Sequence, residues 1–475
     1  MDTTLSRREF LYRSIAGAGA IALTGNTNAT EYQTSNTSTD KPNILLIVSD
    51  DQGWGDANCN WDNTDIETPV IDEVAKTGIR FTQFYVNPLC APTRASFFTG
   101  QYSMENGMWR GPSREKPNDR CIRSDITMLP QFLKKIGYRT GIFGKWHLGY
   151  QKPNTPNDRG FDEFYGFLGG AHPYTPTKVG RLMHNRERYQ EDLHLTDYLT
   201  EKALSFIKDC AEKKTPFFCY VPYNAVHGPL WLADKPRASG KKEWLELYAK
   251  KGVDFPRRDY NATLGHMDNS AGRLLKLIRY LKLEENTLVI YFSDNGACLE
   301  TNETKANYPG NNGPFRGGKG STYEGGIRVP CVMRWKNKFP EGLVSDQMVM
   351  HFDIFSTILE AAGVAIPKMN GSNPVHGISL MKHILSKGKY PLPERTVFWE
   401  LTGKVAVRKG NWKLVGQVDT TRGNWQHIAT ELRDAELELY DLEKDISESK
   451  NLRDKKPAVY AELKKELIGF FENLK

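Results

Sequence analysis

Two pairs of neighbouring polar residues, far apart in the sequence, could together bind a metal ion. Asp50-Asp51 and Asp294-Asn295 each follow closely on an unbroken apolar run, NILLIV and TLVIYF. Such runs are typical of buried parallel strands, so we expect both pairs at the carboxyl edge of a sheet, where these folds bind ligands. Three carboxylates and an amide oxygen suit calcium or magnesium better than zinc or copper. The alternative is that Asp50 and Asp51 only cap a following helix.

A potential nucleophile, Cys90, opens the segment Cys-Ala-Pro-Thr-Arg. Pro92 predicts that a helix begins here, because proline is favoured in the first turn. A nucleophile at a helix N-terminus faces free backbone N–H groups and the positive end of the helix dipole, which favour an anion. Arg94 follows one turn later and is expected on the same side of the helix as Cys90. For the cysteine alone, a buried apolar role is the ordinary interpretation.

This segment resembles the signature of the type I sulfatases, which are formylglycine-dependent members of the alkaline phosphatase superfamily. As in that signature, C-x-P-x-R is followed by Ala-Ser and then by Thr-Gly. Further blocks of the family occur in the same order over most of the chain: PNILLIVSDDQGWGD, GKWHLG, SDNGA, GGKGSTYEGGIRVP and LYDLEKDISESKNL. Thr93 stands where many members carry serine, a position at which the motif tolerates variation.

The resemblance implies that a formylglycine-generating enzyme oxidises Cys90 to an aldehyde (3-oxoalanine). The hydrated aldehyde has two hydroxyls: one attacks sulfur and releases the alcohol, and the other loses its proton and expels sulfate. The resemblance also implies one calcium ion, with magnesium less favoured, held by Asp50, Asp51, Cys90, Asp294 and Asn295. Asp294 is a further candidate to accept the proton of the attacking hydroxyl.

The family pattern also assigns roles to five basic residues. Arg94 braces the diol, and Lys145 and His147 flank it, with His147 as the base for sulfate elimination. His227 and Lys319 contact the sulfate ester, and either could protonate the departing oxygen. Taken singly, a histidine is more often structural and a lysine more often exposed. The RGGKGS segment around Lys319 faintly suggests a phosphate loop, but glycine follows the lysine, so the required spacing is absent.

Sulfated carbohydrate is the expected substrate, and loops around the site should set its specificity. Candidate sugar-binding residues in such loops are Trp109, Arg110, His172, Tyr174 and Trp231. Ordinary loop packing is an equally good interpretation of all five. The sugar, the sulfate position and exo or endo action are not fixed by the sequence.

Apolar and amphipathic segments alternate along the chain, which predicts an α/β fold with a large, mostly parallel sheet flanked by helices. The resemblance makes this alkaline phosphatase-like. Strands are expected at 43–48, 79–86, 138–143, 217–221, 287–292 and 327–335. Helices are expected at 69–77, 126–136, 195–213, 260–281 and 352–362, and surface loops over 150–190.

The pattern of expected helices and strands changes near residue 388. Short strands are expected at 397–401, 405–407, 412–415 and 437–442, followed by a helix at 458–474. They predict a small C-terminal α+β domain of antiparallel strands with a terminal helix. We therefore divide the chain into a catalytic domain, 41–387, and a C-terminal subdomain, 388–475.

The first 29 residues have the layout of an export signal. Arg7-Arg8 precedes the apolar run Ile15–Leu23, in the manner of a twin-arginine signal, and residues 30–40 form a polar linker. The apolar run is too short to cross the roughly 30 Å core of a bilayer, so no stable membrane span is expected. We expect a periplasmic or extracellular protein, exported folded by the twin-arginine machinery after oxidation of Cys90.

The overall charge narrows the function only slightly. A net charge of +7, from 64 basic and 57 acidic residues, is a small surplus on 475 residues. It suits an anionic substrate, although a solvated basic surface is the better explanation, and nothing indicates nucleic-acid binding. The seven cysteines lack CxxC or zinc spacing, and the six besides Cys90 could pair outside the cytoplasm.

Two other functions fit parts of the pattern. A phosphodiesterase or phosphatase of the same superfamily would share the fold, but usually carries two-metal ligand sets rich in His and Asp. A non-catalytic glycan-binding relative would be expected to lack Cys90 or Arg94.

Overall fold

The computed structural model describes residues 41–474, apart from eight short gaps: 63–64, 117–118, 176–180, 229–230, 233–234, 237–238, 300–308 and 421–423. Between residues 229 and 238 it describes no side chain. The predicted signal and linker, residues 1–40, lie outside the described residues. No helix in the part of the chain that the structure describes is long and apolar enough to cross a membrane.

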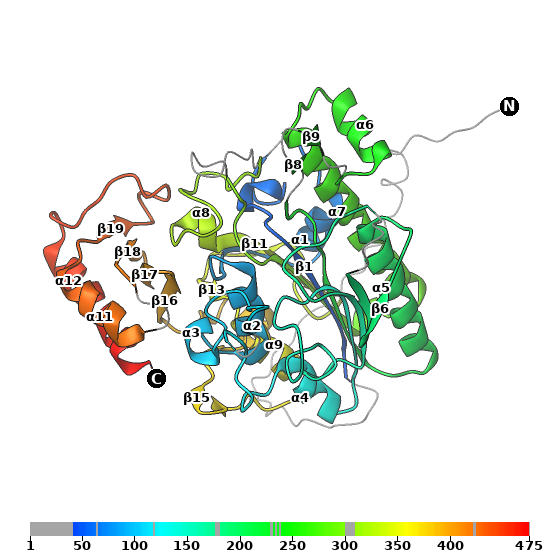
Figure 1. Ribbon diagram of the computed structural model, residues 1–475, viewed down its shortest axis with the longest axis horizontal. Coiled ribbons are helices and arrows are strands. Elements are labelled where there is room, and N and C mark those ends of the chain that lie inside the picture. The colour runs from blue at the N-terminus through cyan, green and yellow to red at the C-terminus, as the bar shows by residue number, and fades with distance from the viewer. Residues whose placement is uncertain are drawn as a thin grey trace, which may run out of the picture. The chain divides into compact units, whose positions relative to one another are not determined.

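A mixed sheet of 11 strands forms the centre of the protein (Figure 1). Strand β1 (Asn43–Ser49) lies in its middle, between β10 (Thr287–Ser293) and β7 (Phe217–Pro222), and is parallel to both. Beyond β7 the parallel arrangement continues with β3 (Arg139–Lys145) and β4 (Glu163–Phe167). Five parallel strands therefore end at the same edge, and the apolar runs predicted four of them, all except β4.

The outer strands of this sheet are shorter or antiparallel. On one side β11 (Arg328–Trp335) runs antiparallel to β10 and to β2 (Ile79–Tyr85), and β12 (Leu343–Ser345) and β13 (Val349–Met350) pair with β2. On the other side a hairpin of β5 (Leu182–His184) and β6 (Glu187–Tyr189) extends the sheet beyond β4. The prediction of loops over 150–190 was therefore wrong for these three strands. They are too short, and too interrupted by glycine and charge, to show a strand period.

Helices cover both faces of the sheet (Figure 1), because alternate residues of the central strands are buried on opposite sides. Leu45 and Ile47 of β1 pack toward α1 (Pro69–Lys76), α5 (Leu195–Glu212) and α7 (Arg257–Tyr280). The other side of β1 belongs to a second core, which includes residues of α2 (Cys90–Thr99), α4 (Leu129–Lys135), α9 (Asp353–Ala361) and α10 (Met381–Leu385). Helix α4 begins three residues later than predicted, since Gln131 and Met128 form its N-terminal cap.

Short helices complete the catalytic part: η2 (Trp54–Asp56), α3 (Ser103–Asn106), α6 (Lys242–Lys250), η3 (Glu284–Asn286) and α8 (Glu324–Ile327). Two two-stranded ribbons also occur there, β8 (Trp231–Leu232) with β9 (Lys235–Pro236) and β14 (Met369–Asn370) with β15 (Asn373–Pro374).

The C-terminal residues form a separate antiparallel sheet, as predicted. Its four strands, in order, are β16 (Thr396–Leu401), β17 (Lys404–Lys409), β18 (Trp412–Gln417) and β19 (Glu438–Asp441). Helices α11 (Trp425–Asp434) and α12 (Pro457–Asn473) pack on it, and α11 was not predicted. This core also takes in Tyr85, Tyr102 and Phe352 of the catalytic part. The division at residue 387 stays a proposal.

Candidate active site

The carboxyl ends of the central strands bring the predicted acidic residues together. β1 and β10 are parallel and in register, with Ser49 opposite Ser293, so the residues that follow them lie side by side. The Asn295 amide donates a hydrogen bond to Asp51 Oδ1 at 2.8 Å, and the Asp51 backbone N–H donates to Asp294 Oδ1 at 3.4 Å. Asp51 is held at a positive φ of 61°, a conformation that non-glycine residues adopt rarely and mostly where the surroundings impose it.

Helix α2 places Cys90 against this edge of the sheet. Cys90 is the first residue of the helix, and its Sγ lies 3.2 Å from Nδ1 of His147. The Thr93 hydroxyl accepts a hydrogen bond from the backbone N–H of Asn87 at 3.0 Å, which fixes the turn that leads into the helix. Burial raises the pKa of the Cys90 thiol, so as an unmodified cysteine it would be a poor nucleophile at neutral pH.

Arg94 links the helix to the strand ends. It is fully buried, and its Nε and Nη2 donate to the same oxygen of Asp294 at 3.0 and 2.7 Å. Nη1 donates to the Lys145 carbonyl at 3.2 Å and to the Tyr220 hydroxyl at 3.1 Å. With its donors engaged in this way, Arg94 locks Cys90 and Asp294 at a fixed separation.

Two lysines contact Asp50 and Asp51, one from the end of a strand and one from a loop. Lys145, the last residue of β3, lies 2.6 Å from Asp50 Oδ2, and Lys319 lies 2.6 Å from Asp51 Oδ1. Burial and the neighbouring Asp294 raise the pKa of Asp50 to about 8. Burial acts in the same direction on Asp51, but Lys319 and His227 outweigh it and hold the pKa of Asp51 well below its usual range. The site therefore stabilises charge unequally on adjacent carboxyl groups.

Both candidate histidines are neutral bases in this setting. Burial and Lys145 lower the pKa of His147 well below its ordinary value, and burial and Lys319 lower that of His227 to about 3. His147, like Asp51, has a positive φ, 57°. His227 Nδ1 donates to the Gly228 carbonyl, and its Nε2 lies 3.9 Å from Asp51 Oδ2.

The residues present fit a divalent cation. Asp50 Oδ1 and Asn295 Oδ1 are buried oxygens without a hydrogen-bond partner, an expensive state unless another group satisfies them. Potential ligand atoms of Asp50, Cys90 and Asp294 lie within 4.8 Å of one another, as do those of Asp50, Asp51 and His227. A set dominated by oxygens suits a hard cation.

The loop that carries Lys319 is tied to three parts of the fold. The Lys319 N–H donates to the Ala297 carbonyl at 3.0 Å, and the Gly320 N–H donates to the Pro88 carbonyl at 2.8 Å, just before α2. Lys404, on β17 of the C-terminal sheet, donates to the Gly320 carbonyl at 2.9 Å. Gly296 is needed here, because a Cβ on it would come within 1.8 Å of the Gly325 carbonyl oxygen.

Comparison with known proteins identifies the family. The sulfatase family model matches residues 42–364, and a model described as "N-sulphoglucosamine sulphohydrolase, C-terminal" matches residues 318–473. The chain belongs to the sulfatase family. Its sequence is 34% identical over 382 residues to the N-acetylgalactosamine-6-sulfatases of Canis lupus familiaris and Homo sapiens, covering 75% of this chain and 68% of each relative.

A solved structure supports the fold. The fold matches the crystal structure of Ps i-CgsB in complex with k-i-k-neocarrahexaose with a TM-score of 0.78 and 29% sequence identity, over 92% of this chain and 94% of that one. The protein is therefore a sulfatase with the expected α/β fold, and it hydrolyses sulfate esters. The family generally uses a formylglycine and a divalent metal.

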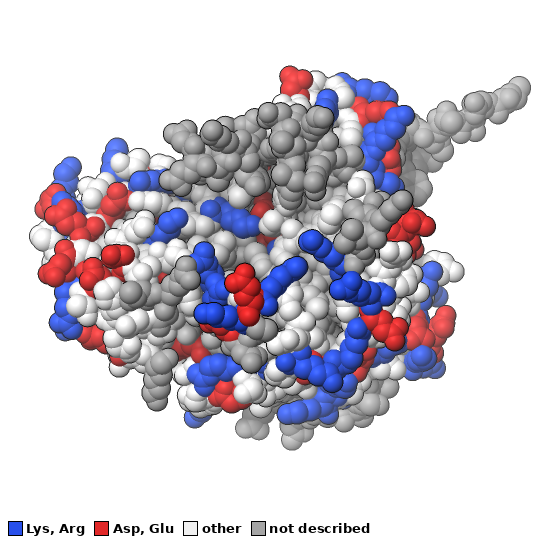
Figure 2. All heavy atoms as spheres, in the orientation of Figure 1, with Lys and Arg blue, Asp and Glu red and all other residues white. Residues whose placement is uncertain are grey.

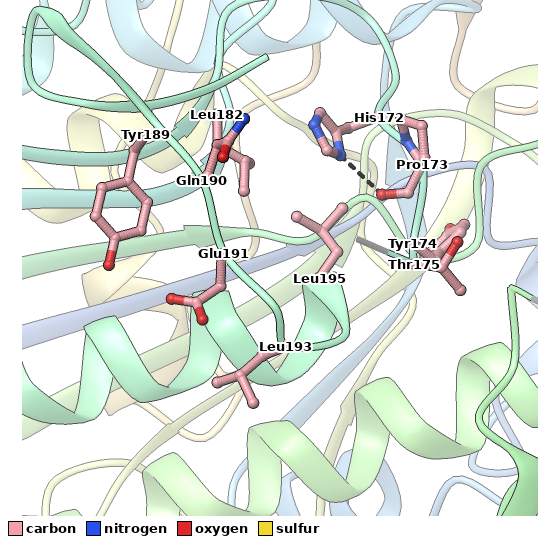
Figure 3. Close-up of a pocket in the computed structure, with 10 residues that line it drawn as sticks. All are labelled: His172, Pro173, Tyr174, Thr175, Leu182, Tyr189, Gln190, Glu191, Leu193 and Leu195. Atoms are coloured by element: carbon pink, nitrogen blue, oxygen red, sulfur yellow. Dashed lines mark hydrogen bonds between the residues drawn. The ribbon is translucent and has the colours of Figure 1, made fainter. Parts of the chain in front are cut away.

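The predicted sugar-binding residues of this sulfatase have varied surroundings. Trp109 packs edge-on against Trp425 of α11, with ring centroids 6.0 Å apart. The buried Tyr174 donates its hydroxyl to the Asn224 and His227 carbonyls at 2.9 and 3.1 Å, so it braces the His227 loop. His172 lies beside it (Figure 3), with Nδ1 on the Pro173 carbonyl and a buried, unpartnered Nε2.

Two of the candidates remain, Arg110 and Trp231. Arg110 is half-buried, and the side chain of Trp231 lies outside the described residues. All seven cysteines lie among the described residues, and none is paired in a disulfide.

Several residues that support the site were not predicted from the sequence. Tyr220, near the end of β7, holds Arg94, and Asn224 bonds the His172 backbone in both directions. Their only sequence signal is position, since both lie at or beyond the carboxyl end of a buried strand. Lys404 carries no such signal, because only the folded C-terminal sheet brings it to the Lys319 loop.

Proposed function

We propose that this sulfatase removes sulfate from a sulfated carbohydrate, with a formylglycine derived from Cys90 as nucleophile and one calcium ion in the site. The observation that carries the proposal is the position of Cys90. It begins α2, lies 3.2 Å from His147, and is joined through Arg94 to the carboxylates at the strand ends. The formylglycine-generating maturation enzyme is the partner that this modification requires.

The two groups that are added to the chain would supply distinct chemistry. The hydrated aldehyde would offer one hydroxyl to attack sulfur and a second whose deprotonation lets sulfate leave. Asp50, Asp51, Asp294, Asn295 and residue 90 would hold calcium, which withdraws electron density from the sulfate oxygens. The unpartnered oxygens of Asp50 and Asn295 support this assignment.

The protein's own cations would stabilise the transferring group. Lys145 at the end of β3 and Lys319 in a hydrogen-bonded loop are both held against the acidic pair, so they need little reorganisation as negative charge builds up. His147 is placed to take a proton from residue 90, because its Nδ1 faces Sγ. Lys319 is better placed than His227 to protonate the departing oxygen, since the proton of neutral His227 lies on Nδ1 and is donated to Gly228.

A carbohydrate substrate is favoured by the relatives. The N-acetylgalactosamine-6-sulfatases are named for a sulfated sugar, and Ps i-CgsB was solved with k-i-k-neocarrahexaose. We also propose export through the twin-arginine pathway to the periplasm or beyond, after folding. Replacing Arg7 and Arg8 by lysine should then retain the protein inside the cell, and unchanged secretion would contradict this.

Activity measurements on matched cysteine variants test the proposal. Protein produced with a maturation enzyme is assayed on defined sulfated oligosaccharides, an aryl sulfate and the corresponding aryl phosphate. We expect sulfate hydrolysis to dominate, to be lost in Cys90→Ala, and to survive in Cys331→Ala, which alters a buried cysteine on β11 away from the site. In Cys90→Ser the serine should release one equivalent of alcohol and retain the sulfate. Full turnover by Cys90→Ala, or a preference for the phosphate ester, would refute the proposal.

A further inference from the structure

Three arginines line a cavity of about 380 Å³ for which the mechanism has no use. Arg114 lies in the loop after α3, Arg181 just before β5, and Arg188 on β6. Tyr150 completes the polar lining, and its ring lies under the Arg114 guanidinium, 4.9 Å from ring centroid to Cζ. All three arginine side chains are exposed to solvent, so the cavity opens outward as a cationic recess.

One segment of chain separates this cavity from the nucleophile. Residues 167–169 and 171 form a wall of the cavity. The same segment contacts His147: the Leu168 carbonyl accepts the His147 backbone N–H at 3.2 Å, and a Cβ on Gly170 would come within 2.8 Å of the His147 ring. Because that ring lies 3.2 Å from Cys90 Sγ, the cavity lies one segment of chain away from the nucleophile, close enough for the next sugar of a substrate that passes over this segment.

Among the described residues, no carboxylate forms an ion pair with Arg114, Arg181 or Arg188, whereas Arg186 on the same hairpin pairs with Asp158 at 2.7 Å. Lys and Arg side chains gather around the centre of the face shown in Figure 2, with few acidic side chains among them. Like charges facing one recess repel each other, and guanidinium groups bind sulfate and carboxylate oxygens well. The recess is therefore suited to an anion.

We propose that Arg114, Arg181 and Arg188 bind an anionic group on the sugar next to the one that loses its sulfate. That group is a second sulfate ester or a uronic acid carboxylate, which share the same recognition chemistry. The inference rests on the proposed function, and it narrows the substrate class from sulfated carbohydrates to polyanionic oligosaccharides. A monosulfated substrate would use only the site at Cys90.

Steady-state kinetics on matched substrates test this proposal. The substrates are an aryl sulfate without a second anion, and oligosaccharides that carry the same target sulfate with a neutral, sulfated or uronic neighbouring sugar. The variants are Arg181→Gln, Arg188→Gln and their combination, with Arg186→Gln as the control on the same hairpin. We expect KM for a polyanionic substrate to rise about tenfold per arginine, the loss of one charge-assisted hydrogen bond, with kcat nearly unchanged. Turnover of the aryl sulfate and the neutral oligosaccharide should not change.

The outcomes separate this inference from the proposed function. If the arginine variants lose the preference for only the sulfated substrate, or for only the uronic one, the result supports the proposal and identifies the anion. If the wild-type protein hydrolyses sulfate esters but does not prefer a neighbouring anion, or if the arginine variants lose activity equally on all substrates, the subsite is refuted and the sulfatase function stands. If no sulfate ester is hydrolysed by correctly matured protein, the proposed function itself fails.

Discussion

Replacing Lys413 by methionine should destabilise the protein by about 3–5 kcal/mol, the usual cost of leaving buried charges without their partner. Lys413 lies on β18, with Nζ 2.9 Å from a carboxylate oxygen of Glu324 and 2.9 Å from one of Glu448. All three side chains are completely buried. Methionine has a similar volume to lysine, so the loss of stability reports the missing charge and not a cavity.

The surroundings of Glu324 and Glu448 determine how much stability the protein loses without Lys413. Burial acts to raise the pKa of Glu324, but Lys413 and Arg408 outweigh it and bring the value down to about 2, so Glu324 is ionised in the folded protein. Among the hydrogen bonds of the described residues, the Glu448 carboxylate otherwise accepts only the Glu324 backbone N–H, at 2.6 Å. Burial and Glu324 raise the pKa of Glu448 despite the lysine. Without the lysine the two carboxyl groups either repel each other in a dry environment or must take up a proton. With an unfolding entropy of about 2.1 cal/mol/K per residue, the expected fall in Tm is roughly 3–5 °C for a chain of this size.

Urea unfolding followed by tryptophan fluorescence measures this change, with calorimetry as a second method. Lys409→Met is the matched control, because Lys409 also lies 2.7 Å from two glutamates, Glu462 and Glu466, but is exposed at the surface. We expect the control to unfold like the wild type. Adding Glu448→Gln to Lys413→Met should recover much of the loss, since Glu324 still pairs with Arg328 at 3.4 Å and no unpaired carboxylate remains. Equal midpoints for Lys413→Met and Lys409→Met would refute the reasoning.

Three further predictions concern the site and the pH dependence of stability. Gly170→Ala places a Cβ 2.8 Å from the His147 ring and should lower kcat about tenfold to a hundredfold without changing the unfolding midpoint. An unchanged kcat would contradict the close packing of Gly170 on His147. Burial lowers the pKa of His351 to about 3, so below pH 6.5 the unfolded chain binds a proton that the folded chain does not. Stability should fall by about 1.4 kcal/mol per pH unit from this group between pH 6.5 and 3, and urea midpoints of His351→Gln at pH 7 and 5 should differ less than those of the wild type. Complete removal of divalent metal by a chelator should abolish activity and lower Tm. Added calcium should restore both better than magnesium does. Activity of the metal-free protein would exclude the metal site.

The sequence predicted the central sheet well because its strands are buried on both faces. The runs NILLIV and TLVIYF admit few other interpretations, and strand ends that carry Asp50 and Asp294 are forced together once β1 and β10 are parallel neighbours. The beginning of α2 at Cys90 followed from Pro92, which favours the first turn of a helix.

Features that depend on long-range packing were not predictable in this way. Trp109 and Tyr174 have the composition expected of sugar-binding residues, yet the ring of one packs on Trp425 and the hydroxyl of the other bonds backbone carbonyls. The β5–β6 hairpin is only three residues long on each side, which is too short for a period. The cationic cavity could not be seen because Arg114 and Arg188 are 74 residues apart and converge only in the folded chain.

The central claim, that residue 90 acts as a formylglycine, is tested most directly by mass spectrometry of the proteolytic peptide that contains it. The protein is produced with a maturation enzyme, its specific activity is measured on a sulfate ester, and the same sample is digested and analysed. We predict that the peptide carries an aldehyde in place of the Cys90 thiol, and that the aldehyde fraction rises in proportion to activity across preparations. Full activity in a sample whose peptide retains only the unmodified thiol would contradict the account.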